Sequence, residues 1–406
     1  MSELRLREGG PPVDCELPDA VAARLARAGV VTLTPLGAGR WEARAARKVG
    51  VVRAGPVTVW VHPKITIARL LWLLGWAARP GWVGGEPVGY APADELVPAL
   101  AEAFVTLAER AVRGGLLQGY REVDDDATVL RGRLREHDQV RERHGLAIPL
   151  LVRYDDHRAD IAENQLLRAA AVRLLRLPGV GAAVRGRLRA LRGSLVDVSD
   201  LVAGMPLPRW RPTRLNARYH EALWLAEIVL AGGAVDHEPG GVRLEGFLVD
   251  LYQVFEDFVT ATLSVALEGH GGRCQRQDRS FLDEGGEVDI RPDLVWRVGG
   301  RPAAVIDAKY KAEQPAGFPQ ADLYQALAYA TAYGLDCAHL VYARGNEVAR
   351  GWTVRNAGVR ITAHTVDLDA PPAGVLAQVD ALAARIAARP PAGPSAALPP
   401  WPRTVR

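Results

Sequence analysis

The sequence predicts a protein of several domains in which helices and strands are mixed, an α/β and α+β fold class, and three observations support this prediction. The chain has 406 residues, 49% of them hydrophobic and 24% charged, which indicates a globular protein too long for one ordinary domain. β-Branched runs and helical segments occur together near both ends of the chain, whereas the middle is mainly helical. We therefore expect an N-terminal mixed β/α domain over 1–115, an Arg-rich, mainly helical region over 116–240, a C-terminal α/β domain over 241–370, and a helix with a Pro-rich tail over 371–406.

The N-terminal domain is expected to pack helices on a small sheet. The stretch "KVGVVRAGPVTVWVHPKITI" contains two β-branched runs joined by Gly55-Pro56, which predicts a hairpin. A helix over "ARLLWLLGWAARP" should end at Pro80, and a second over "ADELVPALAEAFVTLAERAVRGG" has acids in its first turn and stops at Gly114-Gly115.

The middle region shows helical spacing of Leu and Ala in "AENQLLRAAAVRLLRL" and "ARYHEALWLAEIVLAGG", with a loop or short strands around "LAIPLLVRYDDHRAD". Its many arginines have two interpretations that the sequence leaves open: a face that neutralises phosphates, or an ordinary solvated helix surface. The stretch "GVGAAVRG" follows a helix rather than a strand and lacks the lysine of a P-loop, so any nucleotide should be bound by a partner chain.

Several classes of protein are disfavoured by composition. Cys15, Cys274 and Cys337 are odd in number and far apart, which predicts neither a disulfide framework nor a zinc site. The most apolar run carries Arg69 and is shorter than the roughly 20 residues that span a bilayer, so no membrane association is expected. No signal peptide opens the sequence, and we expect a cytoplasmic protein. A net charge of +3 does not by itself mark a nucleic-acid binder.

The C-terminal domain is expected to run helix, strand, strand, helix, strand. Asp250 is a candidate N-cap of the first helix, with Gln253 completing a capping box. The apolar stripe of this helix leaves Glu256 at the edge of the buried face.

Charged residues within an apolar hairpin are the main signal of chemistry. The runs "DIRPDLVW" and "AAVIDAKY" are joined by Gly299-Gly300 and should pair antiparallel. Alternation places Asp307 and Lys309 on one face of the strand and Ala308 on the other, with Asp293 beside Asp307. Burying unpaired charge costs several kcal/mol. A divalent cation held by hard oxygen ligands removes this cost, so we expect Mg²⁺ bound by Asp293, Asp307 and the Ala308 carbonyl.

The lysine suggests the reaction. A metal polarises a phosphate and lowers the pKa of its bound water, while the ammonium of Lys309 can position that water or offset charge on the phosphate. These residue types in this pattern indicate hydrolysis of a phosphodiester.

The segments Pro292-Asp293 and Asp307-Ala308-Lys309 resemble the motif of the PD-(D/E)XK restriction-endonuclease-like fold, with Glu256 on the preceding helix and Gln325 and Tyr329 on the following one. The fuller resemblance is to McrC, the nuclease subunit of the McrBC modification-dependent restriction system. It covers nearly the whole chain up to about residue 370, through "VGVV" to "HPKI", "GYREV" to "LRGRL", "YDDHRADIAENQLLRAA", "RLNARYHEAL", "VFEDFV", "RPDLVW", "VIDAKYK" and "DLYQALAYA".

The resemblance implies a subunit that acts with a partner. McrC-like proteins attach through their N-terminal part to a hexameric AAA+ GTPase, McrB, stimulate its GTP hydrolysis and cut double-stranded DNA at modified cytosines. It implies that Asp293, Asp307 and Lys309 carry cleavage, and that Glu256 and Gln325 support metal and substrate.

Alternatives remain at this point. Glu256 could be a solvated helix residue. Gln325 could close a capping box with Asp322, unless Pro319 begins the helix earlier and places Gln325 and Tyr329 one turn apart on the same face. The whole protein could instead be a non-catalytic activator of an AAA+ GTPase, or a stand-alone repair nuclease of the same fold. His339, in "AHLVYA", is expected to be a strand residue rather than a metal ligand.

Overall fold

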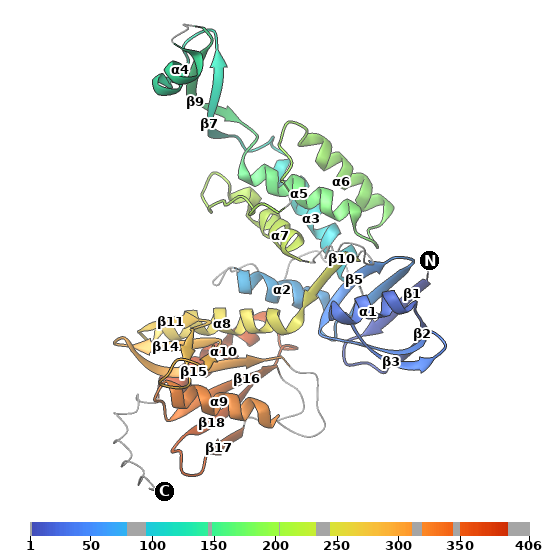
Figure 1. Cartoon of the computed structure of the whole chain (residues 1–406), viewed down its shortest axis with the longest axis vertical. Helices are drawn as coiled ribbons and strands as arrows, with labels where there is room; N and C mark the ends of the chain where they lie inside the picture. The colour runs from blue at the N-terminus through green and yellow to red at the C-terminus, as the bar shows by residue number, and fades with distance from the viewer. Residues whose placement is uncertain are drawn as a thin grey trace. The chain divides into compact units, whose positions relative to one another are not determined.

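A computed structural model of the chain describes residues 2–78, 95–144, 148–202, 204–232, 244–310, 319–343 and 350–388. The chain divides into two compact units (Figure 1): one contains 1–94, 236–244 and 248–406, and the other contains 95–235 and 245–247. The predicted helix end at Pro80 and the Pro-rich tail lie outside the described residues. Among the described helices, none is long and apolar enough to cross a membrane.

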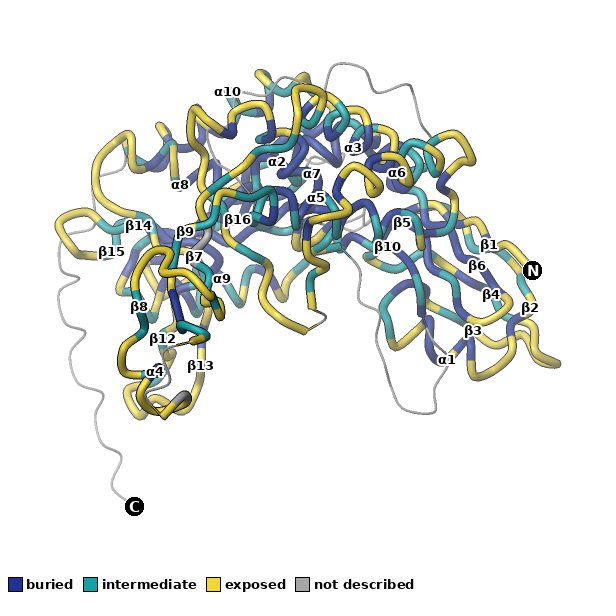
Figure 2. Tube along the Cα trace, turned by 90° about the horizontal axis from the view of Figure 1, so that it is seen from above, coloured by how far each residue is buried: buried dark blue, intermediate teal, exposed yellow. Residues whose placement is uncertain are grey.

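The first unit begins with two small sheets. One sheet has the order β1-β6-β5-β10, built from β1 (Ser2–Arg7), β6 (Val57–His62), β5 (Lys48–Ala54) and β10 (Leu244–Asp250). The predicted hairpin at Gly55-Pro56 is confirmed, because β5 and β6 pair antiparallel from Ala54 opposite Val57. Both strands are buried along most of their length (Figure 2). A second, antiparallel sheet has the order β2-β4-β3, from β2 (Val13–Glu16), β4 (Arg40–Ala45) and β3 (Val31–Gly37).

Two helices accompany these sheets in the first unit. They are α1 (Asp19–Arg27) and the strongly apolar α2 (Ile67–Ala78). The α2 helix packs on α8 (Leu251–Gly269), where the ring centroids of Trp72 and Phe258 are 5.1 Å apart. Both side chains are almost fully buried.

The second unit is a group of helices that carries a long β-hairpin. The helices are α3 (Leu96–Val112), α5 (Ala162–Arg176), α6 (Ala182–Ser194), the short η1 (Ala217–Tyr219) and α7 (His220–Ala231). The sequence predicts that α3 packs on the N-terminal sheet, but α3 packs on α6 and α7 within this unit. Its apolar residues, including Phe104 and Val105, are buried there.

The hairpin of the second unit was predicted only in part. The sequence predicts a loop or short strands around "LAIPLLVRYDDHRAD", and β9 (Leu150–Arg158) is found there. It pairs antiparallel with β7 (Gly119–Ala127) and with the short β8 (Arg133–Leu134), next to α4 (Glu136–Arg143). The sequence of β7, "GYREVDDDA", has no apolar alternation, so its pairing could not be seen in the sequence.

Several arginines of α5 and α6 bind protein groups within this unit. Arg168 Nε lies 2.6 Å from Asp200 Oδ1, and Arg187 Nη2 lies 2.7 Å from Glu109 Oε2 on α3. Arg185 Nε donates to the Val180 carbonyl at 2.9 Å. For these residues the structure favours a role in helix packing over a phosphate-binding face.

The C-terminal part of the first unit is a six-stranded sheet with the order β11-β14-β15-β16-β18-β17. The strands are β11 (Arg273–Arg276), β14 (Leu294–Val298), β15 (Arg301–Lys309), β16 (Cys337–Ala343), β18 (Arg360–Val366) and β17 (Arg350–Thr353). The pairs β15–β16 and β16–β18 are parallel, and the other pairs are antiparallel. A two-stranded hairpin, β12 (Ser280–Phe281) and β13 (Asp289–Ile290), lies between β11 and β14 in the sequence.

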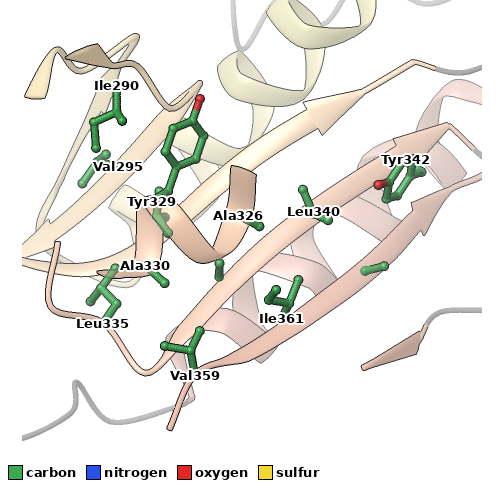
Figure 3. Close-up of a cluster of buried hydrophobic side chains, with 13 residues drawn as sticks. Ile290, Val295, Ala326, Tyr329, Ala330, Leu335, Leu340, Tyr342, Val359 and Ile361 are labelled. Atoms are coloured by element: carbon green, nitrogen blue, oxygen red, sulfur yellow. The ribbon is translucent and has the colours of Figure 1, made fainter. Parts of the chain in front are cut away.

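Helices cover both faces of this sheet (Figure 1). On one face, α9 (Gln320–Ala332) packs Ala326, Tyr329 and Ala330 against Val305 and Leu340 (Figure 3). The other face is covered by α8 and by α10 (Pro372–Ala387), which pack on each other. The predicted helix, strand, strand, helix and strand correspond to α8, β14, β15, α9 and β16, but the prediction missed β11, β12 and β13 before β14 and β17 and β18 after β16. The mixed α/β multidomain architecture is confirmed.

Candidate active site

The helix that presents Glu256 begins at the predicted N-cap. Asp250 Oδ1 accepts a hydrogen bond from the backbone N–H of Tyr252 at 3.1 Å. The expected capping box with Gln253 does not form. The Gln253 side chain instead donates to Asp257 Oδ1, one turn further on, at 3.2 Å. Glu256 follows the N-cap by almost two turns and is half-buried rather than solvated.

The hairpin of β14 and β15 brings the two aspartates together. The strands pair antiparallel with Leu294 opposite Ile306, so Asp293, just before β14, lies next to Asp307 on β15. Gly299 and Gly300 make the turn with φ values of +58° and +79°, which glycine adopts without steric cost. Asp293 and Asp307 are only 7% and 3% exposed.

The backbone of Ala308 fixes the first acid. Its N–H donates to Asp293 Oδ2 at 2.8 Å. In an antiparallel pair the N–H and C=O of one residue face the same neighbouring strand. The Ala308 carbonyl therefore points toward the side where Asp293 lies.

Lys309 completes the charged group on the same face of β15 as Asp307. Its Nζ lies 2.5 Å from Asp307 Oδ2. A further acid, Asp322 on α9, is buried near Lys309 and accepts a hydrogen bond from the Tyr342 hydroxyl at 2.8 Å. Burial acts against the ammonium, but the charge of Asp307 and their ion pair outweigh it, so the pKa of Lys309 is raised.

This site contains more acidic side chains than basic ones. Burial, together with the charge of Asp293, raises the pKa of Asp307 to about 7. Burial, together with the charge of Glu256, raises the pKa of Asp293 to about 6. Burial also raises the pKa of Glu256. Three carboxyl groups that resist ionisation beside one lysine form an environment in which a further cation would be stabilised.

The helix α9 supports the loop that leads to Asp293. The Gln325 side-chain amide donates to the Tyr329 hydroxyl at 2.7 Å, and that hydroxyl donates to the Arg291 carbonyl at 3.2 Å. In Figure 3 the Tyr329 hydroxyl points away from the rest of the cluster. Because α9 begins at Gln320 after Pro319, Gln325 and Tyr329 lie one turn apart on one face. The capping box of Asp322 with Gln325 is therefore wrong.

Two residues near these acids were missed by sequence analysis. The Gln277 side chain contacts both Glu256 and Asp293, at 2.6 and 3.0 Å. Asp322 was considered only as a helix cap, although it lies in the field of Lys309. Neither residue belongs to a local sequence pattern. Both come close to the site only through the tertiary fold. His339 lies on β16 as predicted, with its Nδ1 3.0 Å from His364 Nε2.

The donor set fits a hard, hydrated cation. Within the described ranges, no group of three or more His, Cys, Asp or Glu side chains is arranged to hold a metal ion. Magnesium is commonly held by one or two carboxylates and keeps several waters. Asp293, Asp307 and the Ala308 carbonyl offer two carboxylates and one neutral oxygen, which is consistent with such an ion.

Comparison with known proteins places the chain in a family. A search of curated proteins finds no match. A structure of Thermococcus gammatolerans McrB AAA+ hexamers with bound McrC is similar with a TM-score of 0.57 and 17% identity, covering 95% of this chain and 100% of that one. A cryo-EM structure of the Thermococcus gammatolerans McrBC complex has a TM-score of 0.42 and 19% identity, covering 66% of this chain and 88% of that one. The family model for the McrBC 5-methylcytosine restriction system component matches residues 43–343. Since this match spans well over half of the sequence, the resemblance to McrC is confirmed, and the chain belongs to the McrBC 5-methylcytosine restriction system component family.

Proposed function

We propose that this chain is the Mg²⁺-dependent DNA endonuclease subunit of a GTP-dependent McrBC-type restriction system that cuts modified, methylcytosine-containing DNA. One observation carries the proposal: two buried aspartates and a lysine lie together at the end of the β14–β15 hairpin away from the turn. The Nζ of Lys309 is 2.5 Å from Asp307 Oδ2. A structural ion pair would need one acid, whereas this site holds Asp293, Asp307 and the half-buried Glu256 around one ammonium.

The topology supports a nuclease of the PD-(D/E)XK type. The acid of Pro292-Asp293 precedes one strand of an antiparallel hairpin, and Asp307-Ala308-Lys309 ends the other. On its other side, β15 pairs parallel with β16. The helix α9 covers the face of the sheet that carries Asp307 and Lys309.

Each residue has a distinct task in the proposed reaction. Asp293, Asp307 and the Ala308 carbonyl would hold Mg²⁺, which polarises a phosphate and lowers the pKa of a bound water. Lys309, kept protonated by Asp307, can orient the attacking water or offset the charge on the phosphate. Gln325 donates to the Tyr329 hydroxyl, which donates to the Arg291 carbonyl. These two bonds would position the loop that leads to Asp293.

The partner follows from the family. In the Thermococcus gammatolerans structure, McrC is bound to McrB AAA+ hexamers. We infer that this chain likewise attaches through its N-terminal part to a McrB-like AAA+ GTPase and stimulates its GTP hydrolysis. The glycine-rich stretch 179–186 follows helix α5 rather than a strand, so it is not a P-loop, and we assign the nucleotide to the partner.

The proposal is tested by omission. Plasmid DNA with and without methylated cytosine is incubated with this chain, a McrB-like AAA+ GTPase, GTP and Mg²⁺, and then with each component left out in turn. We expect cleavage only of methylated DNA and only in the complete mixture. Cleavage by this chain alone would indicate a stand-alone nuclease, and faster GTP turnover without any cleavage would indicate a non-catalytic activator.

A further inference from the structure

The loop between β11 and β12 adds a residue to the acid cluster. Gln277 has a φ of +50°, in the left-handed region that non-glycine residues seldom adopt. Its backbone N–H donates to the Asp293 carbonyl at 2.9 Å. Such strained conformations persist only where the surroundings fix them, and they occur preferentially at functional sites.

The surroundings of Gln277 do fix it. The next residue, Asp278, is buried, and its Oδ2 accepts from Arg297 Nη2 at 2.6 Å and from the Tyr333 hydroxyl at 2.9 Å. These bonds attach the loop to β14 and to the end of α9. The left-handed turn is therefore held from both sides, by Asp278 and by the backbone of Asp293.

The side chain of Gln277 lies between two carboxyl groups. Its Nε2 is 2.6 Å from Glu256 Oε1 and 3.0 Å from Asp293 Oδ1. An ionised carboxylate only accepts hydrogen bonds, so the amide must present its two N–H donors to these oxygens. Because the Gln277 amide is uncharged, it can hold the two acids in place without neutralising their negative charge.

We propose that Gln277 is a positioning residue of this site: its amide fixes Glu256 relative to Asp293 so that Asp293 is oriented for divalent-cation binding. Each carboxylate oxygen has two lone pairs, so a bond from Gln277 leaves one available at Asp293 Oδ1. This inference rests on the proposed function and adds a residue from an element outside the Pro-Asp and Asp-Ala-Lys segments.

The experiment separates the amide from the backbone conformation. Gln277→Gly removes the side chain and suits the positive φ, and Gln277→Asn tolerates the same φ but holds its amide one methylene short. Gln275→Asn is the matched control, because Gln275 is exposed on β11. For each protein, the Mg²⁺ concentration that gives half of the maximal Tm increase is measured without DNA, and kcat and KM for methylated DNA are measured in the complete mixture.

We expect both Gln277 variants to need about 10- to 100-fold more Mg²⁺ and to lose kcat by a similar factor, as is typical when the partner of a metal ligand is removed. KM for DNA should stay near the wild-type value. Gln277→Gly should melt at or above the wild-type Tm in EDTA, which excludes misfolding as the cause.

The outcomes distinguish this inference from the proposed function. If wild type cleaves DNA and Gln277→Gly matches it in Mg²⁺ requirement and kcat, Gln277 is only a loop residue and the inference fails. If no protein cleaves DNA but the Mg²⁺ requirement still depends on Gln277, the positioning role stands and the nuclease proposal fails.

Discussion

Burial and negative charge act against each other at Asp307. It lies in the strand "AAVIDAKY", is 3% exposed, and has a second buried acid beside it. Lys309 neutralises only one of these charges at close range. The raised pKa values of Asp293 and Asp307 express the remaining cost, and a bound cation would lower it.

This cost should appear in the stability of the metal-free protein. The pKa of Asp307 is about 7 in the folded chain, against about 3.9 for an unfolded aspartate. Between these values the folded state keeps a proton that the unfolded state has lost, so the stability falls as the pH rises through this window. In EDTA, from about pH 5 to about pH 8, we expect the Tm of wild type to fall relative to that of Asp307→Asn. Parallel Tm curves for the two proteins would show that Asp307 titrates normally.

The ammonium of Lys309 should not be replaceable by another cation. Arginine keeps the charge but presents a planar, bulkier fork in place of a compact point charge. We expect Lys309→Arg to lose cleavage on the order of 100-fold, the usual contribution of one positioned acid–base or charge-stabilising group. DNA binding and the GTP turnover of the partner should be unchanged. Cleavage within a few-fold of wild type would remove Lys309 from the reaction.

At the scale of elements, the β14–β15 hairpin could be predicted because its signals are local. The Gly299-Gly300 turn places Val298 opposite Arg301, and alternation assigns Asp307 and Lys309 to one face. The register shift between Trp296 and Arg297, which brings Leu294 opposite Ile306, has no signal in the sequence. The role of Gln277 could not be predicted, because its place depends on the tertiary pairing of β11 with β14. The same holds for β7, whose polar sequence shows no strand periodicity.

The start of α8 is a local device with a measurable contribution. Asp250 caps the helix and also pairs with Arg47 Nε at 3.0 Å. Removing an N-cap costs about 1 kcal/mol, so Asp250→Ala should lower the free energy of unfolding by about that amount in urea titrations. Asp14→Ala serves as a control, because its ion pair with Arg40 is exposed and should contribute little. Equal stability of both variants would mean that the cap does not hold α8.

At the scale of the first compact unit, residues next to the strands of the N-terminal sheet contact the start of α8 and the residue that follows β15. The Leu251 N–H at the start of α8 donates to the Arg47 carbonyl at 3.2 Å. Lys64 Nζ lies 5.2 Å from the ring centroid of Tyr310, the residue after Lys309. Trp72 of α2 covers Phe258 of α8. The predicted partner-binding part and the predicted nuclease part thus share one core.

This shared core predicts that the two parts fold together. Trp72 is 1% exposed, and truncating a buried tryptophan costs about 3–5 kcal/mol. We expect Trp72→Ala to lower the Tm of the transition that includes α8, and a fragment of residues 244–388 to aggregate or melt well below the full chain. A soluble fragment with the Tm of the full chain would show that the C-terminal sheet is an independent domain. Calorimetry and limited proteolysis of the three proteins make the comparison.

The most direct test of the central claim is plasmid cleavage by wild type and by Asp307→Asn, each with the AAA+ partner, GTP, Mg²⁺ and cytosine-methylated DNA, with GTP turnover recorded in the same samples. The exposed acid Glu284 provides the control substitution, Glu284→Gln. We expect wild type and the control to cut the DNA, and Asp307→Asn to leave it intact while GTP turnover continues at the wild-type rate. Equal cleavage by wild type and Asp307→Asn would contradict the assignment of this site as the nuclease centre.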